Sequence, residues 1–147
     1  WQESIDELER YLKLPTATWP LERSHAMRLI GAAKSRLSLE SGRWFRMAVA
    51  EEPTIRENWF DLAVYGYKTQ SWEECYGAAK KALTITQNIA QHTGCSEAWG
   101  YLLYDYVAIA AHKLGLKDES IKYGEIALQM QPNDERLINN MKFYKET

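Results

Sequence analysis

The sequence is poor in cysteine, has no surplus of basic residues and contains no long apolar run. Its 147 residues include two cysteines, Cys75 and Cys95, which exclude a disulfide scaffold. Its 18 Lys and Arg against 20 Asp and Glu leave a net charge of −2, which argues against nucleic-acid binding. No apolar run approaches the roughly 18 residues of a membrane span, and no secretory signal peptide is visible. We therefore expect a cytoplasmic protein.

Proline is also rare, and no segment alternates between apolar and polar residues as a half-buried strand would. The four prolines, at 15, 20, 53 and 132, separate segments whose apolar residues recur with helical period. The sequence therefore predicts an all-α fold of about eight helices. We expect them over residues 2–13, 21–37, from 38 or 41 to 52, 54–67, 72–92, 96–114, 118–131 and 133–147.

Several expected helix ends have a recognisable residue pattern. Thr54 with Glu57, and Ser71 with Glu74, have the spacing of a capping box, in which a hydroxyl and a carboxylate cap a helix start. Gly115 is expected to end the helix that starts at Ser96.

The sequence repeats itself. Phe45 and Ala48 align with Ala79 and Ala82 at an offset of 34, and Trp59 aligns with Tyr104 at an offset of 45. The longer offset exceeds the shorter by about three helical turns, so we expect an insertion that lengthens the helix over 72–92 without rotating its apolar face.

A 34-residue helix–turn–helix period is typical of the tetratricopeptide repeat, whose small residues let paired helices approach closely. The last repeat matches that pattern best, at Tyr104, Ala108, Ala127 and Pro132. We predict one domain, a right-handed superhelix over 1–147. Its parts are a partial repeat over 1–19, repeats over about 21–53, 54–94 and 96–132, and a capping helix over 133–147.

Residues 2–13 look like the second helix of a repeat whose first helix is missing, so we expect the chain to be a fragment of a longer protein. The missing partner helix predicts an exposed apolar face at Ile5, Leu8 and Leu12, which would favour homodimerisation.

A more specific resemblance covers almost the whole chain. The segments YLKLPTATWPLERSHAMR, RWFRMAVAEEPTIRENWFDLA and WGYLLYDYVAIAAHKLG resemble the helical-repeat region after the catalytic domain of bacterial and phage family-2-type glycosyltransferases. The matching residues are Tyr11, Leu12, Leu14, Pro15, Ala17, Trp19, Glu22, Arg23, Ser24, Met27, Arg28, Glu52, Pro53, Arg56, Glu57, Trp99, Tyr104 and Asp105.

This resemblance implies the non-catalytic tail of a glycosyltransferase. The Asp-x-Asp metal motif of such enzymes is absent from these residues, so we assign no catalytic residue and no cofactor, and expect no enzyme activity of the chain by itself. Cys75 occupies a small packed position, and His92 with Cys95 lacks the second ligand pair of a zinc site, so we expect no metal.

The inner face of the stacked first helices is the candidate binding site. The repeat alignment places Arg23, Lys34, Lys68 and Lys113 there, together with the candidate residues Met27, Ile30, Phe60, Asp61, Val64, Tyr67, Asp105, Tyr106, Ile109 and His112. These residue types do not form the clamp for a C-terminal carboxylate found in some tetratricopeptide domains.

Three functions remain open. The chain could dock a protein partner or glycan acceptor near a catalytic domain of the same polypeptide. It could be a self-assembly module. It could also bind carbohydrate directly, with Trp19, Trp44 or Trp72 stacking on sugar rings.

Overall fold

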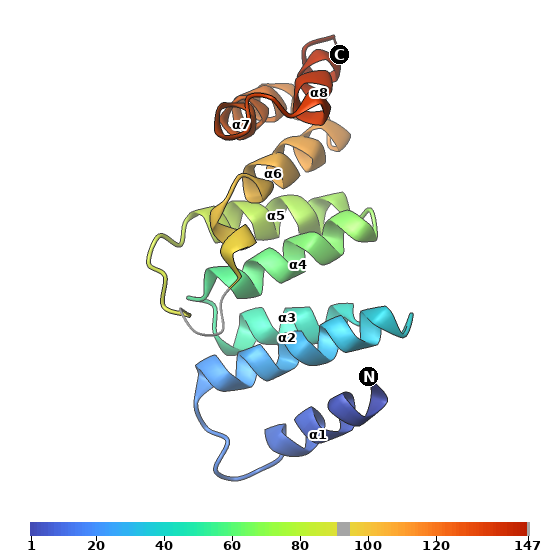
Figure 1. Cartoon of the computed structure of the whole chain (residues 1–147), viewed down its shortest axis with the longest axis vertical. Helices are drawn as coiled ribbons and strands as arrows, with labels where there is room; N and C mark the ends of the chain where they lie inside the picture. Colours follow the sequence, from blue (N-terminus) through green and yellow to red (C-terminus); the bar gives the residue numbers. More distant parts are fainter. Residues whose placement is uncertain (91–94, 147) are drawn as a thin grey trace.

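The computed structural model describes residues 1–90 and 95–146, and within them it confirms the all-α fold. The helices follow one another along the long axis, and the two chain ends lie at opposite ends of the stack (Figure 1). They are α1 (Gln2–Leu12), α2 (Pro20–Arg36), α3 (Gly42–Glu51), α4 (Arg56–Lys68), α5 (Trp72–Leu83), the 3₁₀ turn η1 (Ser96–Trp99), α6 (Leu102–Lys113), α7 (Lys117–Met130) and α8 (Glu135–Glu146). None of these helices is both long enough and apolar enough to cross a bilayer.

Adjacent helices pack in pairs, α2 with α3, α4 with α5 and α6 with α7. Small residues set the close approach: a Cβ built on Gly66 of α4 would lie 2.7 Å from the backbone nitrogen of Cys75 in α5. The largest core cluster joins α3, α4, α5 and α6, with Phe45, Phe60, Ala79 and Val107 among its members, and smaller clusters join α1 to α2 and α6 to α8. Consecutive pairs therefore share buried contacts rather than standing as separate units.

The first helix of each pair ends in the same way. Ser38, Gln70 and Gly115 follow α2, α4 and α6, and each has a positive φ, of 57°, 57° and 78°. The next residue then donates its N–H back into the last turn, as Leu116 does to the Ala111 carbonyl at 2.8 Å. This is the Schellman ending, which confirms Gly115 as the end signal and shows that serine and glutamine occupy the same conformation.

The two capping-box predictions are wrong in detail. Helix α4 begins at Arg56 after Ile55, while the Thr54 hydroxyl donates to Glu52 at 2.6 Å. Ser71 does precede α5, but its side chain makes no cap, because its hydroxyl lies 3.0 Å from that of Thr69. The carboxylates expected to complete both boxes are engaged by side chains of other helices.

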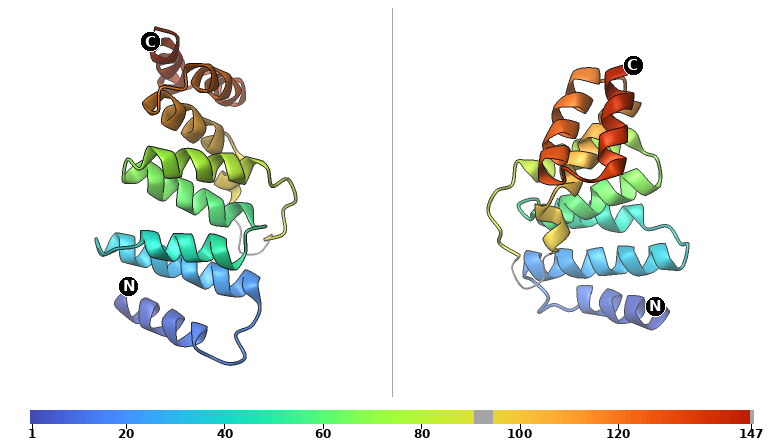
Figure 2. Two further views of the ribbon diagram at one scale, coloured as in Figure 1. Left: turned by 180° about the vertical axis from the view of Figure 1, so that it is seen from behind. Right: turned by 45° about the horizontal axis from the view of Figure 1, so that its top comes forward.

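The long helix predicted over 72–92 is also wrong. Helix α5 ends at Leu83, and residues 85–90 have no regular structure; His92 lies outside the described residues. The Thr84 hydroxyl bonds the Lys81 carbonyl at 2.6 Å, and β-branched Ile85 and Thr86 follow, which disfavours another helical turn. Residues 85–90 run outside the helix stack (Figure 2).

The helix predicted over 96–114 is divided. Ser96–Trp99 forms a 3₁₀ turn, Gly100 is extended, and α6 begins only at Leu102.

The apolar face of α1 is covered, contrary to the sequence prediction. Ile5 is 1% exposed and packs with Ile30 and Ala33 of α2, with Leu8 and Leu12 alongside. The exposed side of α1 is polar, with residues such as Glu3, Asp6 and Arg10. Helix α2 buries the face that was expected to drive homodimerisation.

Candidate functional site

The ten candidate residues of the inner face divide by burial. Met27, Ile30, Phe60 and Asp105 are buried. Six others stay at least partly accessible on α4 and α6, and we call them the inner strip: Asp61, Val64, Tyr67, Tyr106, Ile109 and His112. Any ligand of this face therefore meets α4 and α6 side chains first.

The burial of Met27 and Ile30 has a structural cause. The helix ends Ser38 and Gln70 are equivalent at an offset of 32, whereas the second helices align at 34. The two offsets differ because the α2–α3 connection, which spans residues 37–41, is longer than the connection after α4, which spans residues 69–71. At the offset of 32, the α2 counterparts of Asp61, Val64, Tyr67 and Lys68 are Leu29, Ala32, Ser35 and Arg36, all of which are exposed.

Each first helix contacts the next across a junction. The first junction, where α2 and α3 meet α4, has an ion pair, because Arg28 Nε lies 2.6 Å from Asp61 Oδ2. Burial raises the pKa of the Asp61 carboxyl above its usual range, and the Arg28 guanidinium opposes that shift. The Arg28 side chain is only 8% exposed, so its charge depends on Asp61 for compensation.

The second junction, where α4 and α5 meet α6, is aromatic. Phe60 occupies the position of Arg28, and its ring centroid lies 6.4 Å from that of Tyr106. Tyr106 is also 5.0 Å from Tyr67, whose ring meets Trp72 edge-on at 6.1 Å. Burial raises the pKa of Tyr106 to about 12, so its hydroxyl is protonated at neutral pH.

The third junction, where α6 and α7 meet α8, is again joined by an ion pair. Here the acid lies on the earlier helix and the arginine on the later one, the reverse of Arg28 with Asp61. Arg136 of α8 binds both oxygens of Asp105, at 2.7 and 3.4 Å. Beside it, the His112 ring lies 5.3 Å from that of Tyr144. Burial raises the pKa of Asp105 even against this guanidinium. Asp105 is therefore a structural anchor.

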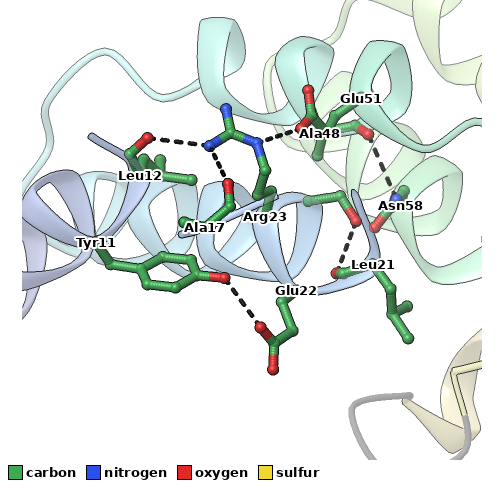
Figure 3. Close-up of polar contacts among 10 residues, drawn as sticks. Tyr11, Leu12, Ala17, Leu21, Glu22, Arg23, Ala48, Glu51 and Asn58 are labelled. Atoms are coloured by element: carbon green, nitrogen blue, oxygen red, sulfur yellow. Dashed lines mark hydrogen bonds and ion pairs between the residues drawn. The ribbon is translucent and has the colours of Figure 1, made fainter. Parts of the chain in front are cut away.

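Two arginines hold the connections that lead into α2 and α6. Arg23 donates to the Leu12 and Ala17 carbonyls at 3.0 and 3.2 Å and pairs with Glu51 (Figure 3). Arg56 donates to the Ile85 and Ala98 carbonyls at 2.8 and 3.2 Å. These contacts hold Leu12 and Ala17 of the first connection, and Ile85 and Ala98 of the second, in place.

The Arg56 cluster explains part of the sequence motif that resembles glycosyltransferase tails. The Arg56 guanidinium lies 4.0 Å from the Trp99 ring centroid, and Trp99 Nε1 donates to Glu57 at 3.1 Å. Arg56, Glu57 and Trp99 all belong to that motif, and all three hold the connection between α5 and α6. Their positions indicate a structural role.

The two cysteines and the possible metal ligands are the remaining candidates for chemistry. The described residues contain no group of three or more metal-ligating side chains. The Cys75 thiol is fully buried, and burial raises its pKa to about 12, so it stays protonated. Cys95 is a partly exposed free thiol, and the His92 suggested as its partner lies outside the described residues.

Comparison with known proteins gives a fold. No protein-family model matches the chain, and no curated protein does. Among solved structures, the chain titled MamA MSR-1 C2 superposes with a TM-score of 0.70 at 15% sequence identity. The alignment covers 99% of this chain and 82% of that one. The fold is tetratricopeptide-like. At this level of identity the likeness concerns architecture alone.

Proposed function

We propose that this chain is a non-catalytic module that docks a protein partner or glycan acceptor through the inner strip. One observation carries the proposal: Tyr67 is 37% exposed while its ring lies 5.0 Å from Tyr106 on the next first helix. The core of a stack does not require an accessible aromatic pair that spans two repeats. Such rings bind partners well, because they offer a large, rigid contact area.

We also propose that the module is the cytoplasmic tail of a bacterial or phage glycosyltransferase. The support is the sequence resemblance, together with the absence of Asp-x-Asp from these residues. The coding sequence upstream of the Trp1 codon tests this parent. We expect an in-frame mixed α/β nucleotide-sugar domain with Asp-x-Asp. A start codon within a few dozen residues, with no such domain, would contradict the assignment.

The docking role is tested in that full-length enzyme with the double variant Tyr67→Ala and His112→Ala. We expect KM for the acceptor to rise at least about fivefold, because each ring removed from the contact is worth about 1 kcal/mol or more. Hydrolysis of the donor should stay unchanged. Met130→Ala is the matched control, since Met130 is 44% exposed on α7. An unchanged acceptor KM in the double variant would contradict the role of the strip.

Carbohydrate binding is the second candidate, favoured by Trp19, which is 56% exposed. Trp44 and Trp72 are weaker platforms, because they are half-buried and have lysine ammonium groups 6.0 and 5.7 Å from their ring centroids. A sugar titration followed by tryptophan fluorescence tests this candidate, and the absence of any saturable change would remove it. The apolar face of α1 that suggested self-assembly is covered by α2. Light scattering tests self-assembly directly.

A further inference from the structure

A cavity opens at the first junction. It has a volume of about 680 Å³ and lies between the end of α2, the α2–α3 connection and the end of α4. Phe45, Val64 and Tyr65 supply apolar wall, and Ser35, Arg36 and Lys68 are among its polar lining. This volume lies within the range of pockets that hold small ligands or large side chains.

The second junction has rings where the first has this cavity, and a smaller, more open hollow of about 480 Å³ remains beside them, lined by Ser71, Trp72, Glu73, Glu74 and Leu114. Tyr67 and Tyr106 are the counterparts of Ser35 and Asp61, both of which line the cavity. Trp72 completes the ring cluster, whereas the connection over residues 37–41 contains no aromatic residue. The cavity therefore exists because small and polar residues stand where the second junction has rings.

The charges around the cavity are unevenly compensated. Both acids in its wall are engaged, Asp61 with Arg28 and Glu40 with the backbone N–H of Arg43 at 3.1 Å. Lys68 has no carboxylate or ring partner among the described residues. Arg36 has only the Trp1 ring, 4.9 Å from its guanidinium carbon. The available charge is positive.

The counterpart of Lys68 shows how such a lysine can be used. Lys113 ends α6 as Lys68 ends α4, and its ammonium lies 5.7 Å from the centroid of the Trp72 ring. An ammonium at this distance from an aromatic face is attracted by it. At the first junction the lysine is present, and the ring is not.

We propose that this cavity binds an aromatic side chain from an acidic, extended segment of a partner protein. The ring packs against the Tyr65 and Phe45 rings, whose centroids are 5.7 Å apart, and flanking carboxylates meet Lys68 and Arg36. This inference rests on the proposed docking function and adds the chemistry of the partner.

Three synthetic pentapeptides, acetylated, amidated and dye-labelled, provide the probes. The first has tryptophan flanked by two glutamates on each side, the second replaces tryptophan by alanine, and the third replaces the glutamates by lysines. In fluorescence anisotropy titrations of the whole chain we expect saturable binding of the first. We expect at least tenfold weaker binding of the other two.

Two variants place the binding in the cavity. Ser35→Tyr introduces the residue of the second junction and should abolish binding without lowering the urea midpoint of unfolding. Lys68→Glu should weaken binding at least tenfold. Lys142→Glu, an equal charge change on exposed Lys142 of α8, is the control and should leave binding unchanged.

Binding that is the same in the wild type, Ser35→Tyr and Lys68→Glu would overturn the proposal, as would the absence of saturable binding up to 1 mM peptide. The acceptor KM of the double variant Tyr67→Ala and His112→Ala distinguishes failure of the cavity proposal from failure of the docking role. Neither residue lines the cavity, so an acceptor effect of that pair can persist when the peptide does not bind.

Discussion

The first and second junctions share an arrangement of helices but have different interiors. Both are framed by first helices that end in a residue with positive φ. One joins its helices by a part-buried ion pair beside a cavity, and the other by a cluster of rings. An ion pair costs desolvation and is specific in geometry, whereas packed rings bury apolar area. The buried Phe60 ring of the second junction is therefore expected to hold the stack together, while the cavity of the first offers a place for a ligand besides the inner strip.

The largest expected effect is at the second junction. Phe60→Ala should destabilise the protein by about 3–5 kcal/mol, because Phe60 is 4% exposed and its loss leaves a cavity in the main core. Urea unfolding followed by far-UV circular dichroism measures this. Leu29→Ala is the control, since Leu29 is 43% exposed, and should change stability by less than about 0.5 kcal/mol. Equal losses of stability from the two changes would contradict the conclusion that Phe60 stabilises the packing between repeats.

The next largest losses of stability concern the two arginines that hold the connections leading into α2 and α6, and these losses should differ in size. Arg56→Gln should cost about 2–3 kcal/mol, because it removes charge-assisted bonds to two carbonyls and the stacking on Trp99. Arg23→Gln should cost about 1 kcal/mol, since the Arg23 side chain is 24% exposed and water can replace part of its contacts.

Urea unfolding compares the two arginine variants, and limited proteolysis between α5 and α6 gives a second measurement. We expect faster cleavage there only in the Arg56 variant. If Arg23→Gln were the more destabilising change, the ranking by burial would be wrong.

The ion pair of the first junction should contribute less. Asp61→Asn should destabilise by about 1–2 kcal/mol, because it leaves the mostly buried Arg28 charge uncompensated. The double change Arg28→Leu with Asp61→Leu should recover most of that loss, since no unpaired charge is left. A double-mutant cycle measures the coupling, and additive effects of the two single changes would show that the pair is not coupled.

The smallest effect concerns pH and is confined to the first junction. Burial, and then the Arg28 charge, lower the pKa of His25 below its ordinary value of 6.5. As pH falls below about 6.5, the unfolded chain therefore takes up a proton that folded His25 does not, and stability is lost. His25→Gln should remove this loss, which we expect to be about 1 kcal/mol or less between pH 7 and pH 5.

Urea midpoints of the wild type and His25→Gln at each pH isolate the histidine, because the carboxyl groups shared by both proteins titrate alike. Parallel pH profiles would mean that His25 titrates in the folded protein as it does in the unfolded chain.

Helix ends that have a local signal in the sequence lie where that signal predicts them. Proline at 20 and 132 and glycine at 115 lie close to observed helix ends. The end of α5 has no such signal, because no proline or glycine occurs between it and position 94, and the connection is held by Arg56 from another helix. The Thr54 and Ser71 boxes do not form because their hydroxyls meet near neighbours in the chain and their carboxylates meet distant side chains.

The candidate site was harder to predict than the helices. An offset of 34 was extended from the second helices to α2, but the longer α2–α3 connection shifts α2 by two residues. A two-residue shift rotates a helical position by about 200°, enough to turn an accessible position inward. This is why Met27 and Ile30 are buried while Ser35 and Arg36 line the cavity. The sequence has three serines and one glycine near this turn, and only the positive φ of Ser38 identifies the equivalent end.

The helical character of the chain, the repeated pairing of its helices and most of their ends follow from the sequence alone. These properties depend on local periodicity and on proline and glycine, whose backbone constraints act within a few residues. Tertiary contacts set which side of α2 is accessible, the covering of α1, and the larger cavity at the first junction than at the second. Those outcomes depend on contacts between residues some 30 to 45 positions apart, such as Arg28 with Asp61, and no short segment encodes them alone.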